Sequence, residues 1–356
     1  MLLLAEGIAS CLVVGREMFS HAVPIVGQYT KFDSELGWVS IPNAYVTDLF
    51  GPGTYFRSNS QGFRNNEEFS KEIPAGRFRV ICSGDSFTLG YGVSNDEAWC
   101  QVLTQLDTRI QSVNMGQTAY GIDQAYLWYE RDGSKLDLDM HIFAFISDDL
   151  ARMTFASHWG YGKPMLTMAN GKLAVTNVPV PHYSAVAAAL AERLPKLNDL
   201  RSLQVLRRLF GGKAASAAAQ DYWERQSRAV PLAFQVFDTL QKQHKEKNAL
   251  FALVYMPSVS DCLGEPGDDE KLLQMVEAES RKRGLWFWNL AGECQQLPGK
   301  RAEGMFFSPA QLAHYHLTPE GNRLTAEMVY RRMKETPEIA ARLERTPENE
   351  KPNEKH

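Results

Sequence analysis

The stretch RVICSGDSFTLGYGV, residues 79–93, decides the fold of this chain. It begins as an apolar run typical of a buried strand and ends in a glycine-broken loop that is rich in aromatic residues. The strand stops at Gly84-Asp85-Ser86. Ligands of an open parallel sheet bind beyond the carboxyl ends of its strands, so this turn lies where a functional site is expected. The alternative interpretation is a small-residue strand exit without a chemical role.

Similar apolar runs recur along the chain and alternate with helical patterns. The expected strands cover residues 78–82, 110–115, 141–146, 250–255 and 285–290. The expected helices cover residues 97–106, 124–129 and 270–283, and a further helix begins near Pro319. Strands separated by helices of this length imply crossover connections between parallel strands. The pattern therefore predicts a three-layer α/β/α domain around a five-stranded parallel sheet.

This alternation divides the chain into regions. Residues 1–26 form an apolar N-terminal segment, and residues 27–76 form an irregular lead-in that is rich in turn residues. The α/β domain covers 77–345, with an insertion at about 151–247. Within the insertion, Asn170-Gly171 separates two alternating runs and predicts a hairpin, and two helical stretches follow. The tail, 346–356, is charged and poor in apolar residues, which predicts disorder.

The composition excludes several classes of protein. The 356 residues are 44% hydrophobic and 22% charged, as in an ordinary globular protein, and the net charge of -4 argues against a nucleic-acid partner. Neither GxxxxGK[ST] nor GxGxxG follows the first strand, so no nucleotide cofactor is expected. The five cysteines are widely spaced and form no CxxC pair, which favours neither a zinc site nor a dense disulfide framework: Cys11, Cys82, Cys100, Cys262 and Cys294.

The N-terminal segment bears on localisation. Residues 2–14 are apolar, but Glu6 and Arg16 leave a run too short to span a bilayer, which needs about 20 apolar residues. The segment also lacks the basic start and the cleavage site of a secretory signal. We interpret it either as a helix docked on the domain or as the end of a membrane anchor. The second interpretation favours an extracytoplasmic, membrane-associated or periplasmic location over the cytoplasm.

A serine in this turn acts as a nucleophile only if a base lies within hydrogen-bond reach. The turn is not the GxSxG elbow of the α/β-hydrolases, because Thr88 stands where the second glycine belongs. Among the eight histidines, His316 in AHYHLTPEGNRLTAE is the candidate base, since it follows the last expected strand and precedes the helix at Pro319. His314 and His316 could also form an HxH metal pair, but no third ligand is evident from spacing.

Together these segments resemble the SGNH (GDSL-type) hydrolases. SGDSFTLGYGV resembles their first block, VNMGQTAYGIDQ their second, FAFISDDL their third and HYHLTPEGNRLTAE their last. The lead-in segments FDSELGW and NSQGFR are similar to bacterial members of uncharacterised, envelope-associated type, which often begin with a membrane anchor. The resemblance covers about residues 33–150 and 248–330. It implies a flavodoxin-like α/β/α fold and a serine esterase mechanism that needs no cofactor or metal.

The resemblance also implies roles for single residues. Ser86 matches the nucleophile, and its amide is one oxyanion donor. His316 matches the general base. The second-block glycine, which donates a backbone amide to the oxyanion, falls on Ala119, and this departure is mild because an alanine also has an amide. Asp85, Gly116 and His314 stand beside these positions and are candidate supporting residues.

Two departures from the family pattern are more serious. The third-block asparagine, a side-chain donor to the oxyanion, falls on Asp148, and an ionised carboxylate accepts but cannot donate. The acid that normally precedes the base by two or three residues is also missing, because Ala313 and His314 occupy those places. His316 then depends on a backbone carbonyl or on an acid from elsewhere for its orientation.

The sequence therefore leaves two classes of function open. In the first, the protein is an ester hydrolase or an acyltransferase acting on a small-molecule or glycan acyl ester, with a Ser86–His316 pair. In the second, it is a catalytically impaired relative that binds carbohydrate or assists assembly in envelope polysaccharide metabolism. The intact serine and histidine favour the enzyme, whereas Asp148 and Ala313 favour impairment.

Overall fold

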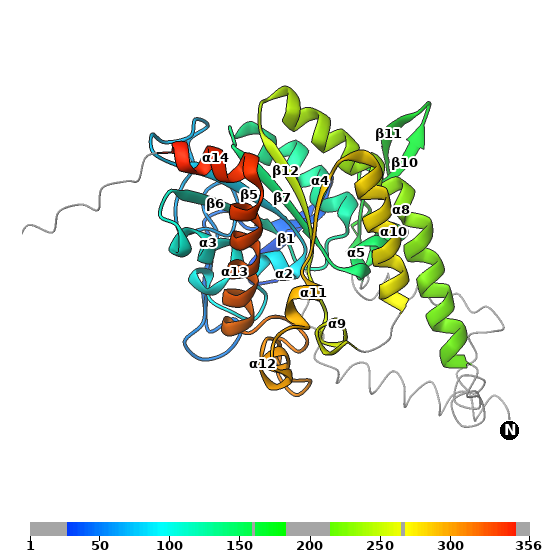
Figure 1. Ribbon diagram of the computed structural model, residues 1–356. Helices are drawn as coiled ribbons and strands as arrows, with labels where there is room; N and C mark the ends of the chain where they lie inside the picture. Colours follow the sequence, from blue (N-terminus) through cyan, green and yellow to red (C-terminus); the bar gives the residue numbers. More distant parts are fainter. Residues whose placement is uncertain (1–26, 159–160, 183–213, 265–267, 347–356) are drawn as a thin grey trace, which may run out of the picture.

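The computed structural model describes residues 27–158, 161–182, 214–264 and 268–346. At its centre lies a five-stranded sheet in the order β13-β12-β7-β5-β6, and every neighbouring pair is parallel (Figure 1). The strands are β5 (Phe78–Gly84), β6 (Ile110–Gly116), β7 (Met140–Phe145), β12 (Leu250–Tyr255) and β13 (Trp286–Asn289). The predicted parallel sheet is thereby confirmed.

The strand order places a topological switch point at β5. This strand, the first of the sheet along the chain, lies between β6 and β7, so the connections that leave β5 and β6 run in opposite directions across the sheet. A crevice forms at the carboxyl ends of strands where the order reverses in this way. Gly84, which ends β5, lies at that point.

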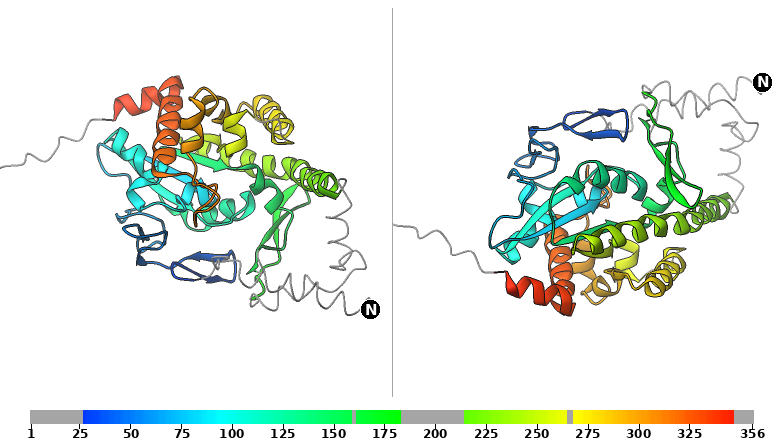
Figure 2. Two further views of the ribbon diagram at one scale, coloured as in Figure 1. Left: turned by 90° about the horizontal axis from the view of Figure 1, so that it is seen from below. Right: turned by 90° about the horizontal axis from the view of Figure 1, so that it is seen from above.

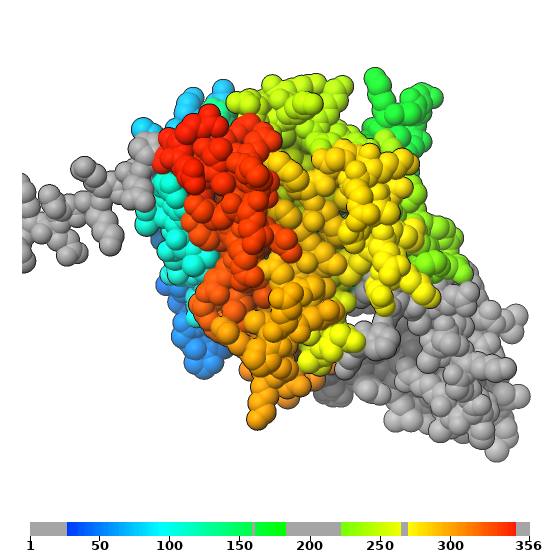
Figure 3. Space-filling view, in the orientation of Figure 1, coloured from blue at the N-terminus to red at the C-terminus, as the bar shows by residue number. Residues whose placement is uncertain are grey.

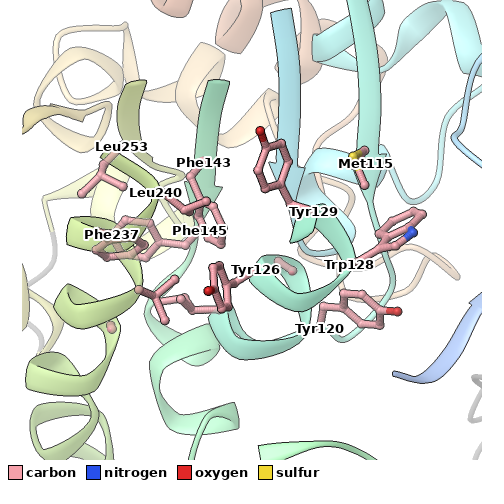
Figure 4. Close-up of a cluster of buried hydrophobic side chains, with 14 of the residues drawn as sticks. Met115, Tyr120, Tyr126, Trp128, Tyr129, Phe143, Phe145, Phe237, Leu240 and Leu253 are labelled. Atoms are coloured by element: carbon pink, nitrogen blue, oxygen red, sulfur yellow. The ribbon is translucent and has the colours of Figure 1, made fainter. Parts of the chain in front are cut away.

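Side chains of alternate strand residues build two apolar layers, one on each face of the sheet. Ile81 and Phe143 belong to the layer beneath α4 (Ile122–Arg131), α8 (Ala214–Glu246) and α10 (Asp268–Arg283). Figure 4 shows Phe143 and Phe145 of β7 packed with Phe237 and Leu240 of α8. Packing in these two layers fixes the positions of the strand ends relative to one another. The candidate site lies at those strand ends.

The opposite face of the sheet is also covered by helices. Val80 and Ile142 contribute to its layer, together with α3 (Trp99–Leu106), α13 (Pro319–Glu335) and α14 (Pro337–Arg345). Figure 3 shows α13 and α14 (red) covering the upper left part of the surface turned toward the viewer. With helices on both faces, the domain has the predicted three-layer α/β/α architecture.

Short helices begin at the carboxyl ends of the strands, which Figure 1 shows at the lower end of the sheet. They are α2 (Ser86–Leu89) after β5, α5 (Ser147–Arg152) after β7, α9 (Val259–Leu263) after β12, and α11 (Ala291–Cys294) and α12 (Gly299–Gly304) after β13. Two 3-10 turns, Asn95–Glu97 and Gly133–Lys135, complete the helical segments of the described residues.

The predicted hairpin in the insertion is present. Strands β10 (Met165–Ala169) and β11 (Lys172–Thr176) pair antiparallel on either side of Asn170-Gly171. Both turn residues have positive φ, 52° and 73°, as a two-residue hairpin turn of type I′ requires. A smaller ribbon, β8 (Ser157–His158) with β9 (Tyr161–Gly162), precedes it.

The second helical stretch of the predicted insertion is α8, which continues through Pro231. Because α8 packs on β12 and α5, the last part of the insertion segment is the crossover helix between β7 and β12. The first stretch, about 185–210, lies outside the described residues, as do the N-terminal segment 1–26 and the tail from 347 onward.

The lead-in is more regular than expected from its turn residues. It forms two antiparallel ribbons, β1 (Thr30–Asp33) with β2 (Gly37–Ser40), and β3 (Tyr45–Thr47) with β4 (Tyr55–Arg57). Figure 2 shows the lead-in (blue) on one side of the molecule and α13 and α14 (red) on the opposite side. Trp38 and Phe56 of these ribbons are fully buried, so the lead-in is an integral part of the packed domain.

A disulfide that the cysteine spacing did not indicate joins Cys262 of α9 to Cys294 of α11. Cys82 and Cys100 are buried free thiols. Within the described part of the chain, no helix is both long and apolar enough to cross a membrane.

Candidate active site

Ser86 is the first residue of α2, at the switch point of the sheet. The side chain of Asp85 accepts a hydrogen bond from the amide of Phe87 at 2.9 Å and so caps the helix. The helix ends after one turn at Gly90, whose φ of 83° lies in the left-handed region. The sequence of small and capping residues thus sets Ser86 at the start of a short, fixed helix.

Gly116 makes room for this helix at the end of β6. A Cβ at Gly116 would overlap the backbone of Thr88 and Leu89, so α2 can lie directly on the strand only because this residue is glycine. Gly84 plays a similar part on β5, where a Cβ would stand 2.5 Å from the carbonyl oxygen of Ala144. Gly116 therefore lies under α2, the helix that begins at Ser86.

His316 meets Ser86 across 230 positions of sequence. The Oγ of Ser86 and the Nε2 of His316 lie 2.9 Å apart, which is hydrogen-bond distance. The loop that carries His316 is fixed by the cap of α13, where Thr318 accepts a hydrogen bond from the amide of Gly321 and Pro319 occupies the first turn. The described structure therefore brings together the two residues that the sequence selected.

The other nitrogen of His316 fixes the tautomer of the ring. Its Nδ1 lies 3.2 Å from the carbonyl oxygen of His314, which can only accept, so Nδ1 carries the proton and Nε2 presents its lone pair to Ser86. Burial lowers the pKa of His316 from 6.5 to about 4, and the imidazole is neutral at physiological pH. His314 itself is exposed and contributes its backbone to this arrangement.

Ala119 has a backbone conformation that glycine adopts more readily than other residues. Its φ is 61°, in the left-handed region, and the residue is buried. Among the described residues, neither the Ala119 amide nor the Ser86 amide donates a hydrogen bond to a protein acceptor. Two free amides at the same sheet edge are the kind of group that stabilises an oxyanion.

The lead-in holds the segment before Ala119. The indole nitrogen of Trp38 donates to the carbonyl oxygen of Thr118 at 2.8 Å, and the hydroxyl of Tyr29 lies 2.7 Å from the Thr118 hydroxyl. The amide of Gln117 donates to the carbonyl oxygen of Gly84 at the end of β5, at 3.2 Å. Residues from the lead-in thus position the second block relative to the first.

Asp148 is an acceptor in this structure and is directed toward α8. Its Oδ1 accepts a hydrogen bond from the hydroxyl of Tyr222 at 2.5 Å, and its Oδ2 lies 3.8 Å from a guanidinium nitrogen of Arg152. The carboxyl side chain is about half exposed (47%). Asp148, which the sequence analysis aligned with a side-chain donor, is therefore a hydrogen-bond acceptor in the fold.

Arg152 links the acidic residues close to Ser86. Its guanidinium contacts Asp149 at 2.6 Å, Asp85 at 3.3 Å and the carbonyl oxygen of Tyr120 at 3.1 Å. Burial raises the pKa of Asp85, an effect that the Arg152 charge opposes. An Oδ atom of Asp85 lies 3.4 Å from the Ser86 hydroxyl, so this buried network reaches Ser86.

Sequence reasoning missed Arg152 and Tyr222. Arg152 stands three residues after Asp149, the spacing at which a helix pairs opposite charges, so a signal for it was present in SDDLAR. No such signal exists for Tyr222, which comes from a distant helix. The described residues include no group of three or more His, Cys, Asp or Glu side chains that could hold a metal ion.

Comparisons with known proteins give likenesses in structure. No family model matches the chain, and no curated protein matches it in sequence. An acetyl xylan esterase is 11% identical, with a TM-score of 0.40, and the match covers 72% of this chain and 99% of the esterase. A lipase/acylhydrolase from Enterococcus faecalis is 12% identical, with a TM-score of 0.38, over 72% of this chain and 96% of the other. A member of the lipolytic protein G-D-S-L family from Veillonella parvula is 11% identical, with a TM-score of 0.37, over 71% and 97%.

Proposed function

We propose that this protein is a serine ester hydrolase in which Ser86 is the nucleophile and His316 the general base. The observation that carries the proposal is the 2.9 Å separation of Ser86 Oγ and His316 Nε2 at the switch point of the sheet. A serine hydroxyl at the start of a helix, hydrogen-bonded to the unprotonated nitrogen of a neutral imidazole, is the arrangement that acyl transfer needs.

The reaction follows from this arrangement. Ser86 Oγ attacks the ester carbonyl carbon while its proton passes to His316 Nε2, and the carbonyl oxygen becomes an oxyanion near the free amides of Ser86 and Ala119. The carbon–oxygen bond to the alcohol then breaks, and the alcohol leaves with the proton from His316. Water attacks the acyl-serine with His316 again as base, which releases the acid and restores Ser86.

The substrate class that we propose is a small-molecule or glycan acyl ester. Acyl transfer to a sugar hydroxyl needs the same residues, with that hydroxyl in place of water in the second half of the reaction. Association with a membrane through the N-terminal segment remains part of the proposal, since it rests on the apolarity of residues 2–14.

A direct experiment is hydrolysis of p-nitrophenyl acetate, combined with labelling by a fluorophosphonate that reacts with activated serines. Ser86→Ala should abolish both signals, and His316→Ala should reduce turnover by about 100- to 10,000-fold, the usual contribution of a general base. Equal turnover by wild type and Ser86→Ala would refute the proposal.

The chain offers a matched control for this test. The Oγ of Ser83 lies 2.8 Å from the Nε2 of His141, a serine–histidine pair with nearly the same spacing. This pair is sealed in the core, since both residues are fully buried. Ser83→Ala should therefore keep full labelling at Ser86 and full turnover, which separates loss of the nucleophile from loss of any buried serine.

Asp148 supports a second candidate, a protein of this fold that binds an acyl-glycan without turning it over. An anion at the third-block position, engaged by Tyr222, opposes the charge that develops in ester hydrolysis. Absence of fluorophosphonate labelling in wild type, together with saturable binding of an acetylated oligosaccharide by calorimetry, would favour this candidate over the esterase.

A further inference from the structure

We propose that the aromatic rings of Phe87 and Tyr91 are positioning residues for His316, and that they orient the imidazole in place of the acid that the loop lacks. The inference rests on the proposed function, because it assigns a role relative to His316 as the base. It goes beyond that function by naming residues outside the serine, the histidine and the oxyanion donors.

The need for such residues follows from the contacts of Nδ1. In a Ser-His-acid triad, the carboxylate holds the imidazole in orientation and in tautomer. Here the partner of Nδ1 is the His314 carbonyl at 3.2 Å, which selects the tautomer. The backbone groups on this side of the ring, the carbonyls of His314 and Ala313, are neutral, so they hold the ring less firmly than a carboxylate would and leave its tilt to be fixed in part by other groups.

Two aromatic rings make those contacts. The ring centroid of Tyr91 lies 4.8 Å from that of His316, and the centroid of Phe87 lies 5.2 Å from it. Both side chains are buried, at 8% and 9% exposure, so they are held in place themselves. The ring planes of Phe87 and Tyr91 are inclined to the imidazole by 34° and 42°, and rings in contact at these distances restrict the rotation of the imidazole by packing.

The same rings belong to the segment that carries the nucleophile. Phe87 follows Ser86 directly, and the amide of Tyr91 donates to the carbonyl oxygen of Ser86 at 3.0 Å. The imidazole is therefore held by groups that move with the serine. This arrangement keeps Nε2 directed at Oγ, although among the described residues the hydrogen-bond partners on the Nδ1 side of the ring are backbone carbonyls and not a carboxylate.

Residues of the lead-in contact Tyr91 and the loop that carries it. Phe50 packs against its ring at 4.7 Å. The fully buried guanidinium of Arg64 donates to the backbone carbonyls on both sides of Tyr91 at 2.5 to 2.6 Å, namely those of Leu89, Gly90 and Val93. A buried guanidinium is costly unless its donors are satisfied, and here those donors define the loop around Tyr91.

The sequence position of the missing acid is occupied by a residue that packs against the Tyr91 loop. Ala313, three residues before His316, is buried, and a Cβ at Gly92 would stand 2.5 Å from its methyl group. Gly92 has a φ of 103°, a conformation that glycine adopts most readily. The base loop and the Tyr91 loop therefore meet at the position where the family pattern has a carboxyl group.

The test compares Tyr91→Leu with Tyr91→Phe in ester hydrolysis. Tyr91→Leu removes the ring and should lower kcat by about 10- to 100-fold, as expected for a misplaced catalytic group, with KM changed less than about twofold. Tyr91→Phe keeps the ring and should retain kcat within about twofold. Phe87→Leu, which removes the other ring, should lower kcat in the same way and serves as the second variant if Tyr91→Leu does not fold.

A matched control and a pH profile separate positioning from general stability. Tyr126 of α4 has the same 8% exposure as Tyr91 but belongs to the apolar layer under α8, so Tyr126→Leu should lose stability without this loss of kcat. Removing a ring that buries His316 should also move the acid limb of kcat/KM from about pH 4 toward 6.5. Tyr126→Leu should leave that limb in place.

The outcomes distinguish this inference from the proposed function. If wild type shows Ser86-dependent turnover while folded Tyr91→Leu and Phe87→Leu keep wild-type kcat and pH profile, the positioning role is overturned and the esterase stands. If wild type neither labels at Ser86 nor hydrolyses ester, both are overturned. Loss of kcat in both ring variants, with recovery in Tyr91→Phe, supports the positioning role.

Discussion

The hydroxyl of Tyr222 donates a hydrogen bond of 2.5 Å to the carboxylate of Asp148 and so ties the third block to helix α8. Burial and the nearby Asp148 charge raise the pKa of Tyr222, so the phenol keeps its proton and remains the donor. One carboxyl oxygen of Asp148 therefore accepts this hydrogen bond, and the other oxygen lies near Arg152. In the proposed reaction, an oxyanion within reach of Asp148 would meet a carboxyl acceptor and not a hydrogen-bond donor.

Replacement of Asp148 by asparagine is therefore expected to increase ester hydrolysis. Asparagine keeps an oxygen that can accept from Tyr222, removes the carboxyl group, and brings an NH2 group that can donate to an oxyanion. One oxyanion donor is typically worth about 100- to 1000-fold in kcat. The measurement is kcat for p-nitrophenyl acetate in wild type, Asp148→Asn and Asp148→Ala. A gain in the asparagine variant alone identifies the donor, whereas equal gains in both variants would show that only removal of the charge matters.

Ala119 offers a test of how its loop is built. The left-handed φ of 61° costs an alanine about 1–2 kcal/mol, whereas glycine adopts this φ without that cost. Glycine loses more conformational entropy on folding than alanine does, which offsets part of the gain. We expect Ala119→Gly to raise the free energy of unfolding by about 0.5–1 kcal/mol, measured by urea denaturation, with the free amide and the turnover retained.

The control for this change is Ala125→Gly in α4. Ala125 is also buried, at 3% exposure against 2% for Ala119, but it lies inside a helix, where glycine costs about 1 kcal/mol. The two substitutions should therefore move stability in opposite directions. A loss of stability in Ala119→Gly would show that the strain at this position is relieved in some other way.

The disulfide between Cys262 and Cys294 is expected to stabilise the site edge of the sheet. It closes a loop of 32 positions, for which the chain-entropy account gives about 3–4 kcal/mol. Reduction with dithiothreitol should lower the melting temperature of wild type, and the variant with both cysteines changed to alanine should match the reduced protein and not respond to the reductant. Cys82 and Cys100 are buried free thiols, so they offer the reductant no second target. Identical melting curves with and without reductant would contradict this expectation.

The parts of the structure that the sequence predicted are those set by local pattern. Apolar runs separated by amphipathic segments predicted the parallel sheet, and Asn170-Gly171 predicted a hairpin because its φ values suit only such residues. The order of the blocks also selected Ser86 and His316, since both follow strands whose carboxyl ends share one edge of the sheet.

The parts that the sequence did not reveal depend on which segments meet in space. Cys262 and Cys294 become neighbours because β12 and β13 are adjacent, which no spacing of cysteines encodes. Tyr222 reaches Asp148 only through the register of α8 on α5. The role of Arg64 could not be predicted either. A lone arginine in the lead-in sequence does not indicate that its guanidinium is fully buried in the loop around Tyr91.

Two buried histidines, His141 on β7 and His244 on α8, are expected to make the free energy of unfolding depend on pH. His141 Nδ1 lies 2.8 Å from His244 Nε2, and the ring of Tyr129 stacks on His141 at 4.2 Å. Both histidines are at most 1% exposed. Burial lowers the pKa of His141 well below 6.5 and the pKa of His244 to about 3. Both histidines are therefore neutral in the folded protein at pH 5. In the unfolded chain the same side chains bind protons below about pH 6.5.

The sign of the effect follows from this difference in proton binding. The contribution of the pair is fully present above pH 6.5 and is lost as pH falls, by about 1.4 kcal/mol per pH unit for each histidine, or about 2 kcal/mol each at pH 5. His244→Gln keeps a hydrogen-bonding side chain beside His141 but removes one titrating group, so it should lose about 2 kcal/mol less than wild type between pH 7 and pH 5. Urea denaturation at the two pH values measures the loss, and His314→Gln, which changes an exposed histidine, should behave like wild type. An equal loss in wild type and His244→Gln would mean that other groups govern the acid sensitivity of the fold.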